Sequence, residues 1–214
     1  MDTDKLLLQS LGAAAEVLRG DNQLFFVGRV SAYDPMSLEL RVDLHRGRET
    51  PQGVLSVCGL PGRTLPEQLT GRRYVVLDGV QDPGNVGTIL RTADAFHADG
   101  LFLVNACADL YNPKTVRASM GAVFRCPVWT CGLEELRALL TKSGLPLYGA
   151  ALRSDTVDVR RADFSHCAVA VGSEGKGLSA ACDLTVRIPM SGHCESLNAA
   201  AAAAVLLWEA ARDD

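Results

Sequence analysis

The chain has 214 residues, of which 48% are hydrophobic and 21% are charged; this suits one packed domain, or one domain with a small addition, and excludes a disordered chain. The net charge of −4 excludes the general basic surplus that most nucleic-acid-binding proteins carry, so any RNA contact needs a local basic patch. No apolar run reaches the roughly 18–20 residues that span a bilayer, and the start of the chain lacks a signal peptide, so we expect a cytoplasmic protein without membrane contact.

The first third of the chain shows short patterns. Residues 5–19 have the spacing of an amphipathic helix, and the apolar runs 24–30 and 53–58 are typical of strands. Residues 59–66 are rich in Pro and Gly and indicate a linker. We therefore predict a small N-terminal αβ appendage over residues 1–70 and a main domain over residues 71–214. Seven arginines here are candidates for a basic patch: Arg29, Arg41, Arg46, Arg48, Arg63, Arg72 and Arg73.

From residue 74 onward, short apolar runs alternate with helical segments. The runs lack the polar alternation of half-exposed strands, which is typical of strands buried on both faces of a parallel sheet. Their alternation with helices predicts an α/β fold, a parallel sheet with helices on both faces. Strands are predicted over residues 74–77, 101–104, 127–130, 147–152, 168–171 and 185–188, and helices over 86–97, 133–143 and 197–212.

The first motif, Asp82-Pro-Gly-Asn-Val-Gly87, follows a predicted strand. Its Asp-Pro-Gly turn reverses the chain, and we expect Asn85 to cap the next helix. The apolar residues of that helix share one face, so Arg91 points away from it, beside the carboxyl end of a strand. Open α/β sheets bind their ligands at that edge. A surface arginine on an amphipathic helix would fit the spacing equally well.

The second motif covers residues 112–127. Lys114, Arg117 and Arg125 supply positive charge, and residues 119–122 form a turn of small residues. By itself this pattern specifies no chemistry.

The third motif covers residues 168–179 and 186–198. Two glycine-rich loops each follow an apolar strand, and glycine lets the backbone approach a ligand closely. The strand ends supply apolar walls and free backbone groups, which suit an adenine ring. We expect Ser196 to cap the last helix.

Two familiar nucleotide-binding motifs compete with this interpretation. Residues 172–179 do not match the phosphate-binding loop G-x-x-x-x-G-K-[ST]. Residues 175–180 match G-x-G-x-x-A, but too few residues follow for the βαβαβ half that this fingerprint opens, which disfavours a dinucleotide site.

The seven cysteines are odd in number and form no C-x-x-C pair. We therefore expect reduced, structural thiols and no metal site. Cys194 is a possible exception, because it lies inside the third motif.

Together the three motifs resemble the SpoU (TrmH-like) branch of the SPOUT superfamily of RNA ribose 2′-O-methyltransferases. The resemblance covers about residues 74–212. It rests on Asp82-Pro-x-Asn-x-Gly87 with Arg91, on Ser119-x-Gly-Ala122 ending at Pro127, and on Gly172-Ser-Glu-Gly-Lys-Gly-Leu-Ser179, Ile188-Pro-Met190 and Glu195-Ser-Leu-Asn198.

This resemblance implies a parallel α/β sheet with a C-terminal deep trefoil knot, S-adenosyl-L-methionine as the cofactor, RNA as the substrate and a homodimer. It implies that Arg91 lies next to the ribose hydroxyl. The residues implied to position Arg91, the ribose and the chain are Asn85, Glu174, Ser196 and Asn198. Those implied to hold the cofactor are Ala150, Ala151, Leu152, Gly172, Ile188, Met190 and Leu197.

The chain departs from the family at His97, where members commonly have Gly. Its N-terminal region resembles a shortened form of the ribosomal-protein-like RNA-binding domain that precedes many members, and residues 50–54 match the last strand of that domain. A non-catalytic RNA-binding protein of the same fold is the alternative function. A SPOUT enzyme that methylates a base nitrogen fits less well, because those branches lack the pairing of Asn85 with Arg91. Ribosomal and transfer RNA both remain open as substrates.

Overall fold

The computed structural model divides the chain into two compact units, Met1–Gly62 and Arg63–Asp214. It describes the second unit over residues 64–151, 156–172, 182–191, 193 and 196–212, and the first unit through the backbone of its strands.

The first unit contains short antiparallel strands: β1 (Ala14–Ala15), β2 (Arg19–Gly20), β3 (Gln23–Leu24), β4 (Gly28–Asp34) and β5 (Glu39–Asp43). Strand β4 pairs with β1 and β5, and β2 pairs with β3. The helix predicted over residues 5–19 is wrong at its C-terminal end, because β1 and β2 occupy that part. Pairing across strands has overridden a local spacing that also suits a helix. The strand predicted over residues 53–58 lies outside the described residues.

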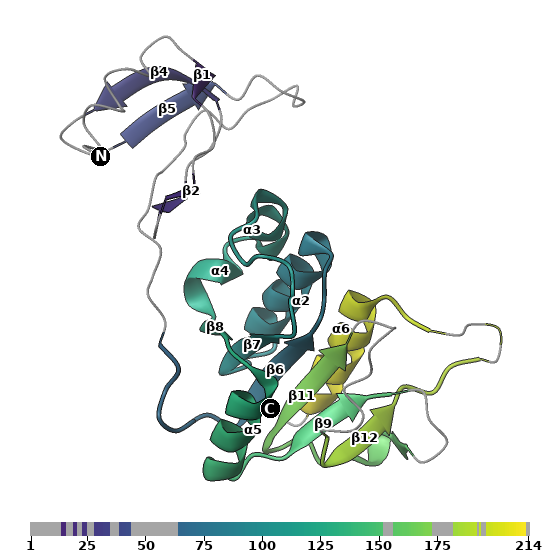
Figure 1. Ribbon diagram of the computed structural model, residues 1–214. Helices are drawn as coiled ribbons and strands as arrows, with labels where there is room; N and C mark the ends of the chain where they lie inside the picture. Colours follow the sequence, from purple (N-terminus) through teal and green to yellow (C-terminus); the bar gives the residue numbers. More distant parts are fainter. Residues whose placement is uncertain are drawn as a thin grey trace. The chain divides into compact units, whose positions relative to one another are not determined.

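A seven-stranded parallel sheet forms the centre of the second unit (Figure 1). Its spatial order is β10-β12-β9-β11-β6-β7-β8. The bounds are β6 (Arg73–Asp78), β7 (Gly100–Val104), β8 (Val128–Thr130), β9 (Leu147–Ala150), β10 (Val157–Asp158), β11 (Cys167–Gly172) and β12 (Leu184–Arg187).

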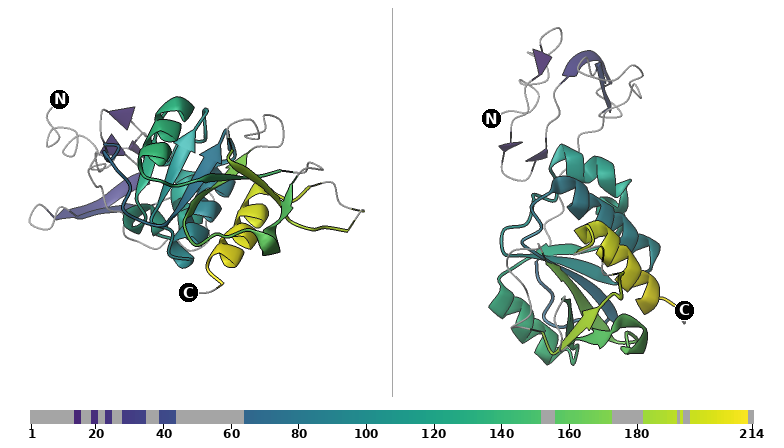
Figure 2. Two further views of the ribbon diagram at one scale, coloured as in Figure 1. Left: turned by 90° about the horizontal axis from the view of Figure 1, so that it is seen from below. Right: turned by 90° about the vertical axis from the view of Figure 1, so that its right-hand side faces the viewer.

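Helices cover both faces of this sheet (Figure 2). One core cluster lies between the sheet and α2 and α6, and a second lies between the sheet and α5. The predicted α/β fold with a parallel sheet and helices on both faces is therefore confirmed. The helices are α2 (Pro83–Ala95), α3 (Pro113–Ser119), α4 (Ala122–Arg125), α5 (Leu133–Lys142) and α6 (Ala199–Ala210), with a 3₁₀ turn, η1 (Val159–Arg161). No helix in the described part of the chain is both long and apolar enough to cross a membrane.

Two predicted helix caps are wrong. Helix α2 is capped by Asp82, whose side chain accepts a hydrogen bond from the Gly84 N–H, and Asn85 lies within the first helical turn. Pro83 supplies the fixed φ angle that starts a helix and needs no backbone partner. Helix α6 is capped by Asn198 and not by Ser196, because the Asn198 side chain accepts from the N–H groups of Ala200 and Ala201.

Helix α2 packs closely against α3, which the sequence pattern did not predict. A Cβ atom added to Gly87 would overlap the carbonyl oxygen of Thr115 and the Cβ of Ala118. The absence of a side chain at Gly87 therefore sets the separation of the two helices. This packing brings the first turn of α3 next to the turn that starts α2.

Candidate functional site

The carboxyl edge of the parallel sheet brings the first and third motifs together. Strand β6 leads into the Asp82 turn, and β11 beside it ends at Gly172, in register with Asp78. Strands β9 and β12 come next along the same edge. Because neighbouring strands are about 4.8 Å apart, these four strand ends form one continuous surface.

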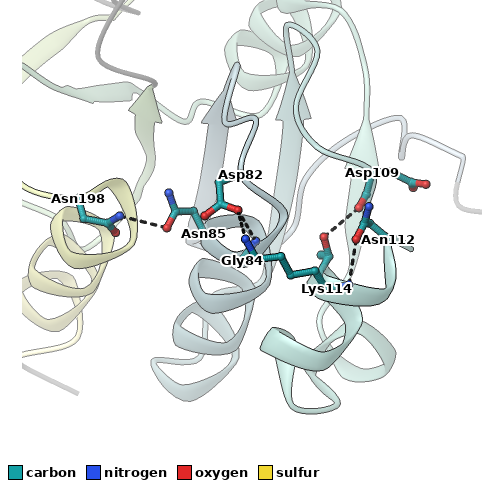
Figure 3. A network of polar contacts seen from close by, with 8 residues as sticks. Asp82, Gly84, Asn85, Asp109, Asn112, Lys114 and Asn198 are labelled. Carbon is teal, nitrogen blue, oxygen red and sulfur yellow. Dashed lines mark hydrogen bonds and ion pairs between the residues drawn. The ribbon is translucent and has the colours of Figure 1, made fainter. Parts of the chain in front are cut away.

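An ion pair ties the turn before α2 to the start of α3 (Figure 3). The Lys114 Nζ donates to Asp82 Oδ1 at 2.6 Å, and the Gly84 N–H donates to the same oxygen at 3.1 Å. The hydrogen bond from Lys114, followed by that from Gly84, lowers the pKa of the Asp82 carboxyl. Asn112 caps α3 by accepting from the Lys114 N–H at 2.9 Å. The turn that carries Asn85 is therefore held from two sides.

Asn85 and Asn198 are in direct contact, although 113 positions separate them in the sequence (Figure 3). The Asn198 Nδ2 donates to Asn85 Oδ1 at 3.2 Å. The Oδ1 of the same Asn198 accepts from the Ala200 N–H at 2.9 Å. A single amide thus caps α6 and ties it to the first turn of α2.

Arg91 is exposed on α2, one and a half turns after Asn85. Its helix buries Val86, Ile89, Leu90 and Ala93, so the predicted orientation of Arg91 away from the apolar face is confirmed. Among the described residues no carboxylate forms an ion pair with it. A guanidinium has five N–H donors, and its exposure on α2 leaves the side chain accessible to a ligand.

Several of the residues expected to hold the cofactor lie at or just after the ends of three neighbouring strands, β11, β9 and β12. Ala150 ends β9, and the N–H of the following Ala151 donates to the Val186 carbonyl oxygen at 3.0 Å. Gly172 ends β11. The side chains of the remaining described members, Ile188, Met190 and Leu197, are half-buried. Leu152 and Glu174 lie outside the described residues, whereas Ser196 is described and half-buried.

Arg73 departs from the role that the sequence suggested, and the buried carboxylate of Asp78 was not predicted. Arg73 was a candidate for an RNA-binding patch, but it is only 4% exposed, and its guanidinium donates to the Ala210 carbonyl oxygen at 2.6 Å. It therefore stabilises the C-terminus of α6, where a cation is favourable. Asp78 was not singled out, yet it is a carboxylate only 6% exposed at the carboxyl edge. Its position at the end of an apolar strand was the available signal.

The fold and the edge define a class: a parallel α/β protein whose strand ends form an apolar surface beside exposed polar groups, which suits a nucleotide-like cofactor. The sequence pattern of the SpoU rRNA Methylase family matches residues 72–208. The chain belongs to this family.

Characterised proteins of known sequence support this assignment. The chain is 39% identical, over 164 residues, to the 23S rRNA (guanosine(2553)-2′-O)-methyltransferase RlmP of Bacillus subtilis; the match covers 75% of this chain and 65% of that protein. It is 37% identical, over 195 residues, to the 23S rRNA (uridine(2479)-2′-O)-methyltransferase of Streptomyces viridochromogenes, with coverages of 83% and 66%.

A solved structure is similar as well. The AdoMet-bound rRNA methyltransferase of Sinorhizobium meliloti superposes with a TM-score of 0.72 at 35% identity, covering 77% of this chain and 66% of that one. The chain thus spans about two thirds of the length of each of these three proteins.

Proposed function

We propose that the chain is an S-adenosylmethionine-dependent methyltransferase that acts on a ribose 2′-hydroxyl of RNA. The strongest support is the hydrogen bond between Asn85 and Asn198, because it joins the first and third motifs near Arg91. This hydrogen bond lies at the carboxyl edge of the sheet, where β11, β9 and β12 end. The relatives from B. subtilis and S. viridochromogenes are 2′-O-methyltransferases of 23S rRNA, which favours ribosomal RNA as the substrate. Transfer RNA is the alternative.

The chemistry of the strand ends fits the cofactor. Ala150, Ala151, Ile188 and Met190 offer half-buried apolar surface beside backbone groups, which suits an adenine ring. Gly172 has no side chain that would obstruct this surface. Leu152 and Leu197 would complete the set. The cofactor supplies a methyl group on a positively charged sulfur.

When bound, the cofactor would supply its methyl group to the ribose oxygen and leave as S-adenosylhomocysteine, and the proton of the hydroxyl would pass to solvent. The protein must align the hydroxyl and assist the loss of this proton. We assign Arg91 to contact with that hydroxyl. Because a guanidinium is almost always protonated, Arg91 acts by orienting and polarising the hydroxyl while it holds a neighbouring phosphate. Asn85, Asn198, Glu174 and Ser196 position these groups.

Two finer features are proposed from family membership, a deep trefoil knot in the C-terminal part and a homodimer. The position of β11 between β6 and β9 supports the knot, since a late segment returns to the middle of the sheet. Exposed apolar residues on α6 support the dimer: Val205 is 37% and Trp208 is 61% exposed. Most soluble oligomers are two-fold symmetric. We also propose that residues 1–70 contact RNA and that the protein acts in the cytoplasm.

The decisive experiment compares ribose methylation across the total RNA of a deletion strain and its parent. One 2′-O-methyl group is expected to be missing in the deletion strain. Purified full-length protein with S-adenosylmethionine should restore it on RNA from that strain, and Arg91→Ala should not. An unchanged methylation map would refute the proposal. Binding of this RNA without any transfer would instead support the non-catalytic alternative.

A further inference from the structure

Asp78 is a buried carboxylate that the proposed reaction does not use. It ends β6 and is 6% exposed, whereas the five residues before it form the interior of the sheet. A carboxylate in such a position is costly unless it is paired or serves a ligand. Perturbed or buried titratable groups also gather at functional sites.

A strained turn holds this carboxylate. The Asn105 Nδ2 donates to Asp78 Oδ1 at 2.6 Å. Asn105 and the following Ala106 both have positive φ angles, 53° and 58°, which non-glycine residues rarely adopt. Hydrogen bonds from Gly79 N–H to Val104 O and from Ala108 N–H to Val80 O fix the same loop. Strain of this kind persists where the surrounding structure enforces it, and it gathers at ligand sites.

One oxygen of Asp78 keeps its capacity to accept. Among the residues that the structure describes, Asn105 is the hydrogen-bond partner of this carboxylate, and it engages Oδ1. None of the described residues donates to Oδ2, so within this part of the chain that oxygen can accept from another donor. A donor that carries positive charge would suit it best, because charge-assisted hydrogen bonds are the strong ones.

The location of Asp78 indicates which donor this is. Its strand neighbour in register is Gly172, and β9 and β12 lie beyond it. On its other side Asp78 is in register with Val104 of β7, and along the chain it is followed by the Asp82 turn and Asn85. Asp78 thus lies beside Gly172, which is assigned to the cofactor, and precedes in the chain the turn that carries Asn85, which is assigned to the hydroxyl. The part of S-adenosylmethionine beyond its sulfur is an amino acid with an ammonium group.

We propose that Asp78 binds the α-ammonium group of the cofactor's methionine part, with Asn105 holding the carboxylate in place. This rests on the proposed function, because it assumes that S-adenosylmethionine is the cofactor. The competing interpretation is that Asp78 only fastens the 105–108 loop. The two differ in which part of the ligand Asp78 recognises.

Calorimetric titration with two ligands separates them. S-adenosylhomocysteine carries the ammonium group, and 5′-methylthioadenosine lacks the whole amino acid part. In full-length Asp78→Asn, which keeps shape and removes charge, affinity for S-adenosylhomocysteine should fall about tenfold to a hundredfold. Affinity for 5′-methylthioadenosine should stay within about twofold. Asp99→Asn is the matched control, because Asp99 accepts backbone N–H groups at the amino edge of the sheet; it should alter neither affinity.

A second variant tests the same role if Asp78→Asn fails to fold. Glycine suits the positive φ angle at position 105, and Asn105→Gly removes the amide that holds Asp78. The affinity for S-adenosylhomocysteine should therefore fall severalfold, and the affinity for 5′-methylthioadenosine should not change. An equal fall for both ligands, or no fall for either, overturns the role of Asp78. If the unaltered protein binds neither ligand, the proposed function itself fails, and this inference fails with it.

Discussion

His97 ends α2 in a backbone conformation that favours glycine. Its φ angle is 53°, and the Ala98 N–H donates to the Ala93 carbonyl oxygen at 2.9 Å, as in a Schellman motif. An L residue with a Cβ atom costs about 1–2 kcal/mol there. We predict that His97→Gly raises the free energy of unfolding by about 1 kcal/mol in urea titration. His97→Ala should give no such gain, and a less stable glycine variant would contradict the argument.

Arg91 is the residue whose replacement tests the mechanism. It is exposed and makes no ion pair with a described residue, so Arg91→Ala should change stability by no more than about 0.5 kcal/mol. Binding of S-adenosylhomocysteine should persist, because Arg91 is not among the residues proposed to hold the cofactor. Methyl transfer should fall about 10²–10⁴-fold. Arg91→Lys should rescue poorly, since an ammonium cannot hold phosphate and hydroxyl in one planar fork. Loss of folding or of cofactor binding would show that the residue is structural.

Single residues also show where sequence patterns mislead. Each helix start at the site offers two capping candidates within one turn, Asp82 and Asn85 for α2, and Ser196 and Asn198 for α6. All four residues are Asp, Asn or Ser, which are good caps, so the pattern could not choose between them. The choice follows from Pro83, which starts α2, and from the contact of Asn198 with Asn85. The burial of Asp78 had one signal in the sequence, its position at the end of an apolar strand, although a strand-end carboxylate is usually exposed.

At the scale of elements, the close packing of α2 on α3 makes a prediction. Gly87→Ala places a Cβ against the backbone of Thr115, which cannot move aside as a side chain would. We expect a loss of about 1–3 kcal/mol in unfolding free energy, as for other overpacked cores. Gly132→Ala is the control, because nothing lies near its added Cβ, and it should cost under about 1 kcal/mol. If Gly87→Ala and Gly132→Ala lowered the unfolding free energy equally, in thermal and in urea unfolding, the packing argument would be contradicted.

The Asn198 amide joins two elements, and its two roles can be separated. Asn198→Asp keeps an oxygen to cap α6 but loses the donor to Asn85. We predict nearly unchanged stability and reduced methyl transfer for this variant. Asn198→Ala removes both roles and should also cost about 1 kcal/mol of stability. Full activity of the Asp variant would mean that the contact with Asn85 does not serve the reaction.

Elements with a strong apolar pattern were predictable, and short or paired ones were not. The six strands and three helices predicted after residue 74 all occur, because a sheet buried on both faces demands continuous apolar runs. The structure adds β10, α3 and α4, which are too short to show a period. In the first unit, local spacing predicted a helix where pairing with β4 makes a strand of Ala14–Ala15.

At the scale of the whole molecule, the proposed dimer predicts that a charged residue on the exposed apolar surface of α6 prevents dimerisation. Trp208 is exposed and packs edge-on against Phe96 at the end of α2, with ring centroids 6.2 Å apart. Trp208→Glu should convert a dimer into a monomer in light scattering at micromolar concentration, because a charge within an apolar interface is unfavourable. Thr141→Glu, on the exposed surface beyond α5's buried face, should remain dimeric. A monomeric unaltered protein would refute the dimer.

The strand order has a consequence for the chain as it leaves the ribosome. Strand β6 finds one neighbour, β7, soon after it is made, but its other neighbour, β11, is Cys167–Gly172 and emerges far later. Until then the newly made β6 presents an unpaired edge flanked by apolar side chains, a template for pairing with other nascent chains. The same late arrival places Gly172 beside Asp78. The arrival of β11 therefore covers the exposed edge of β6 and begins the binding edge, which β12 and residues 188–197 complete afterwards.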